Sequence, residues 1–265
     1  MNTPTPSFSV QVDVTNPGQF FASCGLLELA HRLWPGAEGW FESEQFAVAT
    51  PKKKGSLPSL LDQLLTADIQ RGSVVTVIRD SVGKPAQLGK VLPIEIGDPF
   101  DLRLAWWLDE IEGCFTELKL WSGQQQSWGV FEVLWQTMGA FDLGNHDLFD
   151  LFDHHAALKS RIGLDPRSAW DGLDAGFSPN KLQIPVSTYV AVEVLGAIGL
   201  CACRPRLTND RFTYTTWRWP LAAPVARAVS AGAIAMSGAV SYEFALRDRG
   251  QFQAFSYATP TTNNL

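Results

Sequence analysis

The chain has 265 residues and a net charge of −6, and 46% of its residues are hydrophobic while only 18% are charged. This length and composition indicate a folded protein with a sizeable core and exclude a chain that is too polar to fold. The acidic balance excludes a protein that binds nucleic acid through an overall basic surface. Ten Trp and sixteen Phe leave two interpretations open, an aromatic core or a surface that partners cover.

Alternation and helix-start signals predict a strand and a long helix at the beginning of the chain. Residues 8–14 alternate apolar and polar side chains, which favours a strand. Asn16 and Pro17 suit the start of a helix over 19–33, and its broad apolar stripe indicates that it is mostly buried. Further along the first half we expect strands at 46–49, 74–78, 91–96 and 102–108, and helices at 59–68 and 130–138.

The second half begins with segments rich in turn residues, at 142–153 and 170–181, which we predict to be irregular. We then expect a second buried apolar helix at 186–201, a helix at 222–235, and strands at 212–219, 240–246 and 252–257. This order predicts an α+β fold with mixed or antiparallel sheets and two buried apolar helices. We expect one domain over residues 1–265, with a subdivision near 155–180 left open.

The cysteines and the chain start predict a cytoplasmic protein with reduced thiols. Residues 1–8 are rich in Pro and Thr and do not resemble a signal peptide, and no uninterrupted apolar run reaches the ~18 residues of a membrane span. Cys201 and Cys203 are separated by one residue, whereas redox and zinc motifs need two, so we interpret them as small core residues. The other two cysteines are Cys24 and Cys114.

No residue pattern predicts catalysis, a cofactor or a bound metal. A candidate metal cluster consists of His146, Asp150, Asp153 and His154, but its spacing matches no known ligand set. There is no G-x-S-x-G motif and no phosphate-binding glycine loop. Glu28 and Glu193 lie on the two apolar helices, where we expect them at the helix edges. We therefore predict that the protein is not an enzyme.

Nucleic-acid binding is favoured by the distribution of cations and amides. Residues 200–265 contain seven arginines and three acidic residues, which is a net charge of +4. The rest of the chain therefore carries −10. Arginine suits phosphate contacts and stacking on bases, so a local face could bind a polyanion. The segment 119–126 is rich in glutamine between two tryptophans, and glutamine can donate and accept hydrogen bonds. The alternative interpretation of these residues is a solvated loop or face.

Four segments in the same order resemble the Csb/Csx-type subunits of type I-U (also called I-G) CRISPR systems. Residues 12–30 include Asp-Val-Thr-Asn-Pro-Gly-Gln-Phe-Phe, and residues 119–125 read Lys-Leu-Trp-Ser-Gly-Gln-Gln, where the family has Lys-Thr-Trp-Ala-Gly-Gln-Gln. The other two are residues 174–180 and residues 195–200, which Arg204 and Pro205 follow. Leu120, Ser122 and the Cys-Ala-Cys run at 201–203 depart from the family pattern. None of the four segments is a catalytic signature.

The resemblance implies a non-catalytic subunit of a crRNA-guided, DNA-targeting surveillance (Cascade) complex. Its partners would be crRNA, target DNA, the other CRISPR effector subunits and a recruited helicase-nuclease that cleaves DNA. We expect a large-subunit-like role in PAM and target DNA recognition and in R-loop stabilisation. The alternatives are a crRNA-gripping backbone or capping subunit, a protein–protein adaptor without nucleic-acid contact, and a metal-dependent nuclease that uses the His/Asp cluster. The expected nucleic-acid contacts are Lys52, Lys53, Lys54, Lys119, Gln124, Gln125, Gln126, Arg204, Arg206, Arg211 and Arg218.

Overall fold

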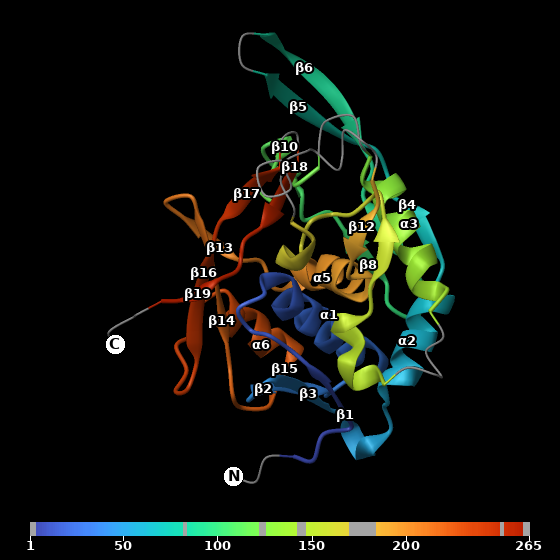
Figure 1. The fold of residues 1–265 in the computed structure, drawn as a ribbon, viewed down its shortest axis with the longest axis vertical. Helices are drawn as coiled ribbons and strands as arrows, with labels where there is room; N and C mark the ends of the chain where they lie inside the picture. The colour runs from blue at the N-terminus through green and yellow to red at the C-terminus, as the bar shows by residue number, and fades with distance from the viewer. Residues whose placement is uncertain are drawn as a thin grey trace.

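Two apolar helices, α1 (Pro17–Leu33) and α5 (Val190–Ala202), cross at the centre of the computed structural model (Figure 1). The structure describes residues 4–81, 84–121, 126–141, 147–169, 184–249 and 252–261. The Asn16 side chain caps α1 by accepting from the Gln19 N–H, and Pro17 occupies the first turn. Both helices are almost completely buried, as their apolar composition predicts.

A four-stranded antiparallel sheet covers one side of α1. Its order is β1 (Phe8–Gln11), β3 (Gln45–Ala49), β2 (Glu38–Glu42) and β15 (Leu221–Ala222). Phe41 and Phe46 of this sheet pack on Trp217, whose indole N–H donates to the Gly39 carbonyl at 2.8 Å. This contact joins the first sheet to a second one that is built from the end of the chain.

The second four-stranded antiparallel sheet lies at the left edge of Figure 1, and helix α6 (Ala223–Ser230) packs against it. Its order is β13 (Arg206–Thr208), β14 (Arg211–Thr216), β16 (Val240–Phe244) and β19 (Thr259–Pro260). The inner face carries Tyr214, which stacks on Phe20 with ring centroids 4.2 Å apart and donates its hydroxyl to the Val14 carbonyl. Because side chains alternate along a strand, the polar residues of β14 on either side of Tyr214 lie on the opposite, outer face of the sheet.

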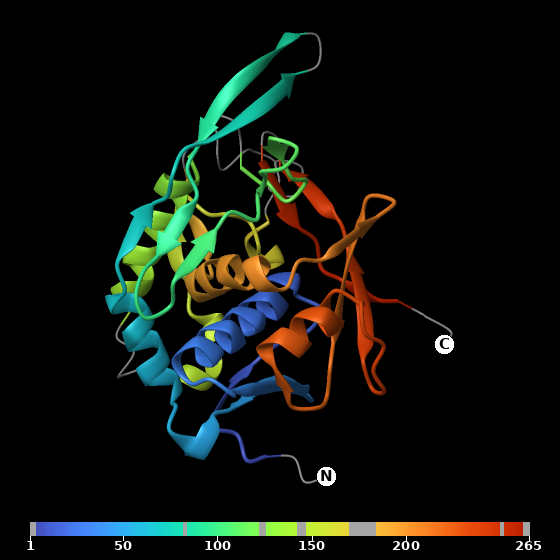
Figure 2. The same ribbon diagram turned by 180° about the vertical axis from the view of Figure 1, so that it is seen from behind.

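Smaller elements surround this centre, and Figure 2 shows the β5–β6 hairpin projecting beyond the body. The remaining strands are β4 (Ile69–Arg71), β5 (Val75–Ser81), β6 (Lys84–Val91), β7 (Ile94–Ile96), β8 (Leu102–Leu104), β9 (Leu108–Asp109), β10 (Cys114–Phe115), β11 (Ala156–Leu158), β12 (Val186–Thr188), β17 (Leu246–Arg249) and β18 (Phe252–Phe255). The remaining helices are α2 (Leu57–Thr66), α3 (Ser127–Gly139) and the short 3₁₀ turns η1 (Pro51–Lys53), η2 (Leu148–Asp153) and η3 (Pro166–Ser168).

The predicted α+β fold with antiparallel sheets and two buried helices is confirmed, with corrections to individual elements. The expected helix at 186–201 begins only at Val190, because residues 186–188 pair with β11 instead. The expected strand at 102–108 is divided between β8 and β9. The segment 170–181 and part of 142–153 lie outside the described residues. Within the described ranges, no helix is long and apolar enough to cross a bilayer.

Candidate nucleic-acid interface

A two-residue hairpin turn places two arginines of the C-terminal third, Arg206 and Arg211, on one face. Asn209 and Asp210 both have positive φ, 49° and 60°, as the tightest hairpin turns require, and Asn and Asp tolerate that backbone conformation. Arg206 lies opposite Thr213, and Thr208 lies opposite Arg211. Because residues that face each other across antiparallel strands share a face, Arg206 and Arg211 both point outward. We call residues 204–216 the arginine hairpin.

The arginine hairpin presents unpaired positive charge to solvent. Arg204, Arg206 and Arg211 are exposed, and in the described part of the chain none of their guanidinium groups forms an ion pair or a hydrogen bond. Glu243 of β16 faces Thr213 on the same side of the sheet and is half-buried. The outer face therefore combines the cations Arg206 and Arg211 with the Glu243 carboxylate and neutral hydroxyl groups, while Asp210 adds an exposed carboxylate at the turn. The two unpaired guanidinium groups are suited to contact with a polyanion.

The fourth predicted arginine, Arg218, lies beyond the far end of β14. Six residues lie between it and Arg211, five of them in β14, so the two arginines are roughly 20 Å apart at the usual rise per residue. Arg218 is exposed, and the neighbouring Trp219 is 50% exposed with its indole N–H donating to the Ser237 carbonyl at 3.2 Å. An exposed indole beside an arginine offers a surface on which a base can stack.

The three predicted lysines at 52–54 occupy a different part of the molecule. They lie in and just after η1, between β3 and α2, at the bottom of Figure 1, away from the β13 end of the arginine hairpin. All three are exposed, and Lys52 and Lys53 have positive φ values of 56° and 52°. The structure therefore does not combine these lysines and the arginine hairpin into one compact site.

The ammonium group of Lys119 is engaged in contacts within the protein. Its ammonium donates to the Trp121 carbonyl at 2.9 Å and lies 4.6 Å from the centre of the Phe115 ring. These contacts fix the backbone just before residues 122–125, which lie outside the described residues together with the predicted contacts Gln124 and Gln125. Gln126 is exposed at the N-cap of α3, and its side chain makes no capping hydrogen bond.

Most of the described tryptophans belong to the core, so an aromatic interior accounts for much of the unusual composition. Trp106, Trp107 and Trp121 form a buried cluster of edge-to-face rings with centroids 5.2–5.9 Å apart. Neither indole N–H of Trp106 and Trp107 has an acceptor among the described residues. The segment that opens the predicted glutamine-rich motif is thus anchored in the core through Trp121.

One buried cation was not singled out from the sequence. Arg161 is only 6% exposed, and among the described residues no acceptor is hydrogen-bonded to its guanidinium, whose Nε is fully enclosed. Burial lowers its pKa, while the charge of Glu193 opposes that shift. Strand β18 connects this region to the 119–121 segment, because Gln253 N–H donates to Leu120 and Phe255 N–H donates to Gly163. Only burial distinguishes Arg161 from exposed arginines, and the sequence carries no signal for that.

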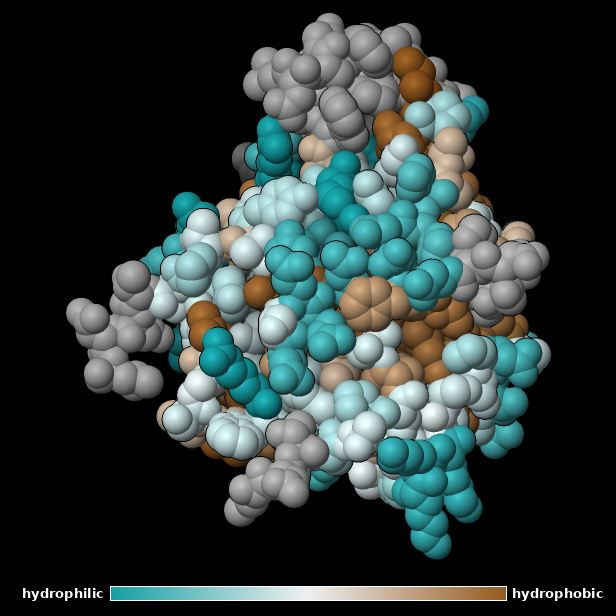
Figure 3. Space-filling model, turned by 60° about the horizontal axis from the view of Figure 1, so that its bottom comes forward, coloured by the Kyte–Doolittle hydropathy of each residue, from teal (hydrophilic) through white to brown (hydrophobic). Residues whose placement is uncertain are grey.

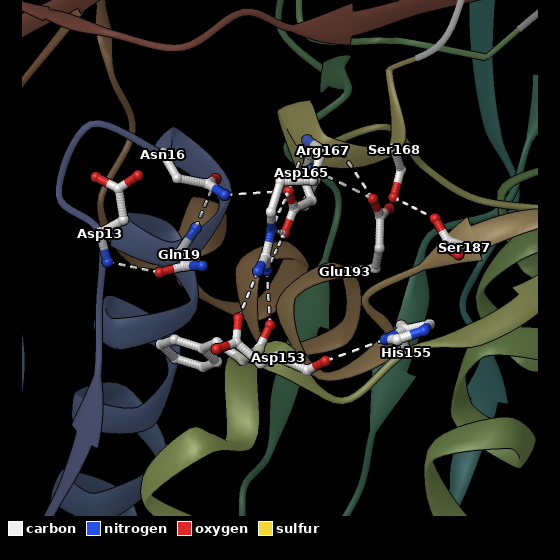
Figure 4. Close-up of polar contacts among 12 residues, drawn as sticks. Asp13, Asn16, Gln19, Asp153, His155, Asp165, Arg167, Ser168, Ser187 and Glu193 are labelled. Carbon is white, nitrogen blue, oxygen red and sulfur yellow. Dashed lines mark hydrogen bonds and ion pairs between the residues drawn. The ribbon is translucent and has the colours of Figure 1, made fainter.

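The two glutamates on the central helices are buried, so their predicted placement at helix edges is wrong. Glu193 is completely buried and accepts hydrogen bonds from four consecutive backbone N–H groups, those of residues 162–165, at 2.8–3.3 Å. Figure 4 shows its carboxylate turned toward Asp165. Burial raises its pKa, while these N–H groups act in the opposite direction. Its carboxylate therefore holds a loop in place and is already fully engaged.

Glu28 is 2% exposed and forms ion pairs with Arg32, at 2.8 Å, and with Arg227 of α6. Burial alone would raise the pKa of Glu28, but the hydrogen bonds from the two guanidinium groups lower it below its usual value. The pair with Arg227 connects α1 to α6. Glu28 is thus a buried structural ion pair rather than an exposed edge residue.

The described residues do not bring the candidate His/Asp cluster together. Asp153 accepts from Arg167, which also binds the buried carboxylate of Asp165 and lies over the Tyr189 ring at 3.4 Å (Figure 4). Asp150 is exposed and His146 lies outside the described residues. In the described ranges, no group of three or more His, Cys, Asp or Glu side chains is arranged to hold a metal ion.

An open depression of about 770 Å³ lies between β1, α2 and η2. Figure 3 views the molecule with its lower end turned forward, where apolar patches show between hydrophilic side chains. The lining combines apolar groups such as Phe8 and Phe149 with the carboxylates Asp62 and Asp147. These carboxylates would repel phosphate, so the depression is a poor candidate for the nucleic-acid site.

Comparison with known proteins adds no further assignment. No protein-family model matches the chain. No curated protein and no solved structure matches it either.

Proposed function

We propose that this protein is a non-catalytic, nucleic-acid-binding subunit of a crRNA-guided type I CRISPR surveillance complex. The four segments that resemble type I-U subunits motivate the choice of complex. The arginine hairpin is the observation that carries the proposal, because exposed guanidinium groups without acidic partners on a polar sheet face are suited to a phosphate backbone.

The charge distribution supports a local contact rather than general binding. The outer face of β13 and β14 carries Arg206 and Arg211, while residues before 200 carry a net −10. In such complexes, base pairing reads the target while proteins contact backbone shape and a short duplex motif. A large-subunit-like role near target DNA is our first choice, with crRNA, target DNA, the other effector subunits and a helicase-nuclease as partners and the cytoplasm as location.

The Trp219 and Arg218 pair favours single-stranded nucleic acid as the direct ligand. An exposed indole stacks on any base, and an adjacent guanidinium reaches the backbone, without a need for a defined sequence. A strand that follows the outer face of β14 would contact the arginine hairpin at one end and Trp219 at the other. This arrangement fits both a displaced DNA strand and a crRNA. A comparison of the affinities for single-stranded DNA and single-stranded RNA distinguishes the two.

Co-expression with the other effector subunits and a guide RNA tests the assignment. We expect the chain to co-elute with the ribonucleoprotein and its Arg206→Ala/Arg211→Ala variant to assemble but to bind target DNA more weakly. Glu243→Gln removes the carboxylate on the same face and should tighten binding. A chain that stays apart from the ribonucleoprotein, or that cleaves nucleic acid alone with added divalent metal, would contradict the proposal.

An adaptor without nucleic-acid contact is the competing assignment. The low charged fraction, 18%, is the observation in its favour, because the centres of protein interfaces are depleted in charge. It predicts that the arginine variants assemble and retain wild-type affinity for target DNA at every salt concentration.

A further inference from the structure

The first strand of the chain has a free edge. β1 lies at one end of its sheet with β3 as its neighbour, and the Val12 N–H, just after β1, donates to the Glu44 carbonyl at 2.9 Å. Because hydrogen-bonded and non-hydrogen-bonded pairs alternate along an antiparallel ladder, Val10 also bonds to β3 whereas Ser9 does not. The backbone N–H and C=O of Ser9 therefore point away from β3, and neither is hydrogen-bonded within the described part of the chain.

This edge borders the open depression of about 770 Å³ between β1, α2 and η2. Residues 7–9 line it from the strand, residues 56–58 and Asp62 from α2, and residues 147–149 from the start of η2. Phe149 is 39% exposed, although it is a large apolar side chain. We call the depression and its lining the β1 groove: it places apolar side chains beside a strand edge that can still pair.

The β1 groove also carries negative charge that lacks a partner. Asp62 and Asp147 belong to its described lining, which contains no basic residue. The Asp147 carboxylate accepts from the Phe149 N–H at 2.9 Å, and neither carboxylate forms an ion pair with a described residue. Lysines 52–54, which precede α2, do not pair with them either. The groove is therefore complementary to a cationic occupant.

These three features together favour a peptide over a small cation. A metal ion or an amine would contact the carboxylates alone and leave the Ser9 backbone and the Phe149 ring without a partner. An extended peptide can pair with the free edge, pack apolar side chains on the walls and present a basic side chain to the carboxylates. Its N–H would donate to the Ser9 carbonyl, and one of its carbonyls would accept from the Ser9 N–H.

We propose that the β1 groove binds an extended segment of a partner protein in which basic side chains stand next to apolar ones. The segment adds to the sheet at Ser9, packs against Phe8 and Phe149, and places a Lys or Arg beside Asp62 and Asp147. This contact goes beyond the proposed nucleic-acid function, because it uses a surface that repels phosphate. It is measured without nucleic acid, so the two proposals fail separately.

Binding of synthetic peptides to the full-length protein, followed by fluorescence anisotropy, tests the proposal. Three labelled peptides of equal length alternate valine with lysine, valine with glutamate, and serine with lysine. We expect saturable binding of the valine–lysine peptide only, since glutamate meets like charge and serine does not fill the apolar walls. Absent binding of the valine–lysine peptide, or equal affinity for either of the other two, would overturn the proposal.

Two substitutions of Ser9 locate the contact at the strand edge. Ser9→Pro removes the free N–H without removing a hydrogen bond between β1 and β3, and proline is tolerated on edge strands. Ser9→Ala keeps the backbone N–H and removes only the hydroxyl. We expect the valine–lysine peptide to lose binding to Ser9→Pro and to keep wild-type affinity for Ser9→Ala. Equal affinities for the two variants would show that the peptide does not pair with β1, and the proposal would fail.

The charge contribution is measured with Asp62→Asn/Asp147→Asn, in which asparagine at 147 can still cap η2. We expect this variant to bind the valine–lysine peptide about fivefold more weakly than wild type. Glu112→Gln removes an exposed carboxylate outside the groove and should leave the affinity unchanged. Equal losses in both proteins would mean that the peptide senses only the total charge, against the proposal. This comparison decides even if Ser9→Pro folds poorly.

A second copy of this chain is the competing occupant of the β1 groove. Sedimentation velocity of the peptide-free protein over a range of concentrations distinguishes it. We expect a monomer at concentrations at which the valine–lysine peptide binds. A dimer that Ser9→Ala preserves and Ser9→Pro abolishes would assign the groove to self-association and overturn the proposal.

Discussion

Gly25 of α1 and Gly199 of α5 lie so close together that neither helix could carry a side chain at the crossing. A Cβ atom at Gly199 would be 1.8 Å from the Phe21 carbonyl oxygen and 2.9 Å from the Gly25 nitrogen. Glycine is the residue that permits such an approach of two backbones. The buried centre of the protein, and with it the position of every candidate contact beyond α5, depends on this crossing.

Gly199→Ala should therefore destabilise the protein by about 3 kcal/mol, because the added methyl group meets backbone atoms that cannot rotate away. Denaturant unfolding followed by circular dichroism measures the change. Gly129→Ala is the matched control: no atom lies within 4 Å of its Cβ position in α3, so alanine should stabilise by about 0.5–1 kcal/mol. Equal effects of the two substitutions would contradict the described helix crossing.

Glu28→Gln tests the buried ion pair between α1 and α6. We expect a loss of about 2 kcal/mol at pH 7, because two hydrogen bonds from guanidinium groups lose their charged acceptor and Arg32 and Arg227 are themselves partly exposed. The pKa of Glu28 is lowered by folding, so the stabilisation is present above the usual glutamate pKa and disappears as the pH falls through the lowered value. Unfolding free energies of both proteins from pH 7 to pH 3 should converge at the acid end; a difference that stays constant with pH would refute the ion-pair role.

Glu193→Gln probes the carboxylate that binds four backbone N–H groups. A glutamine amide offers one acceptor oxygen, and its NH₂ group would face N–H donors of residues 162–165. Leaving buried donors without acceptors should cost at least about 2 kcal/mol. Hydrogen exchange should show faster exchange at residues 162–165 than elsewhere in the variant, and protection that is unchanged at these amides would count against this anchoring.

The helices and the antiparallel character of the fold could be predicted because their signals are local. Asn16 and Pro17 mark the start of α1, and the apolar run after Val190 is too long for a strand in this setting. Strand β13 was missed although Asn209 and Asp210 between two short polar-apolar runs are a hairpin signal. Short strands such as β12 could not be predicted, since their existence depends on a partner more than twenty residues away.

The candidate site was predictable only in part, for a similar reason. Sequence composition identified Arg206 and Arg211, and the strand register placed them on one face. The roles of the other residues depend on tertiary contacts that no local sequence pattern indicates. Lys119 donates to the Trp121 carbonyl, and Glu193 and Arg161 are buried.

Lys119 and Gln126 can be assigned separate roles by mutation. Lys119→Ala removes the hydrogen bond to Trp121 and the contact with the Phe115 ring, so we expect a stability loss of about 1–2 kcal/mol. Gln126→Ala should change stability by less than about 0.5 kcal/mol, because the side chain is exposed and makes no capping bond. Target-DNA binding by the assembled complex that weakens in Gln126→Ala would identify a direct contact, and unchanged binding would remove Gln126 from the interface.

The salt dependence of nucleic-acid affinity tests the central claim most directly. Binding of single-stranded RNA, single-stranded DNA and duplex DNA of mixed sequence is measured by fluorescence anisotropy over a range of salt concentrations. For wild type we predict a linear fall of log affinity with log salt, and for Arg206→Ala/Arg211→Ala a slope that is shallower by roughly 0.7–0.9 for each lost phosphate contact. Arg103→Ala, which removes an exposed arginine already paired with Glu110, should leave the slope unchanged. Wild-type protein whose affinity is independent of salt, or equal slopes for all three proteins, would contradict the account.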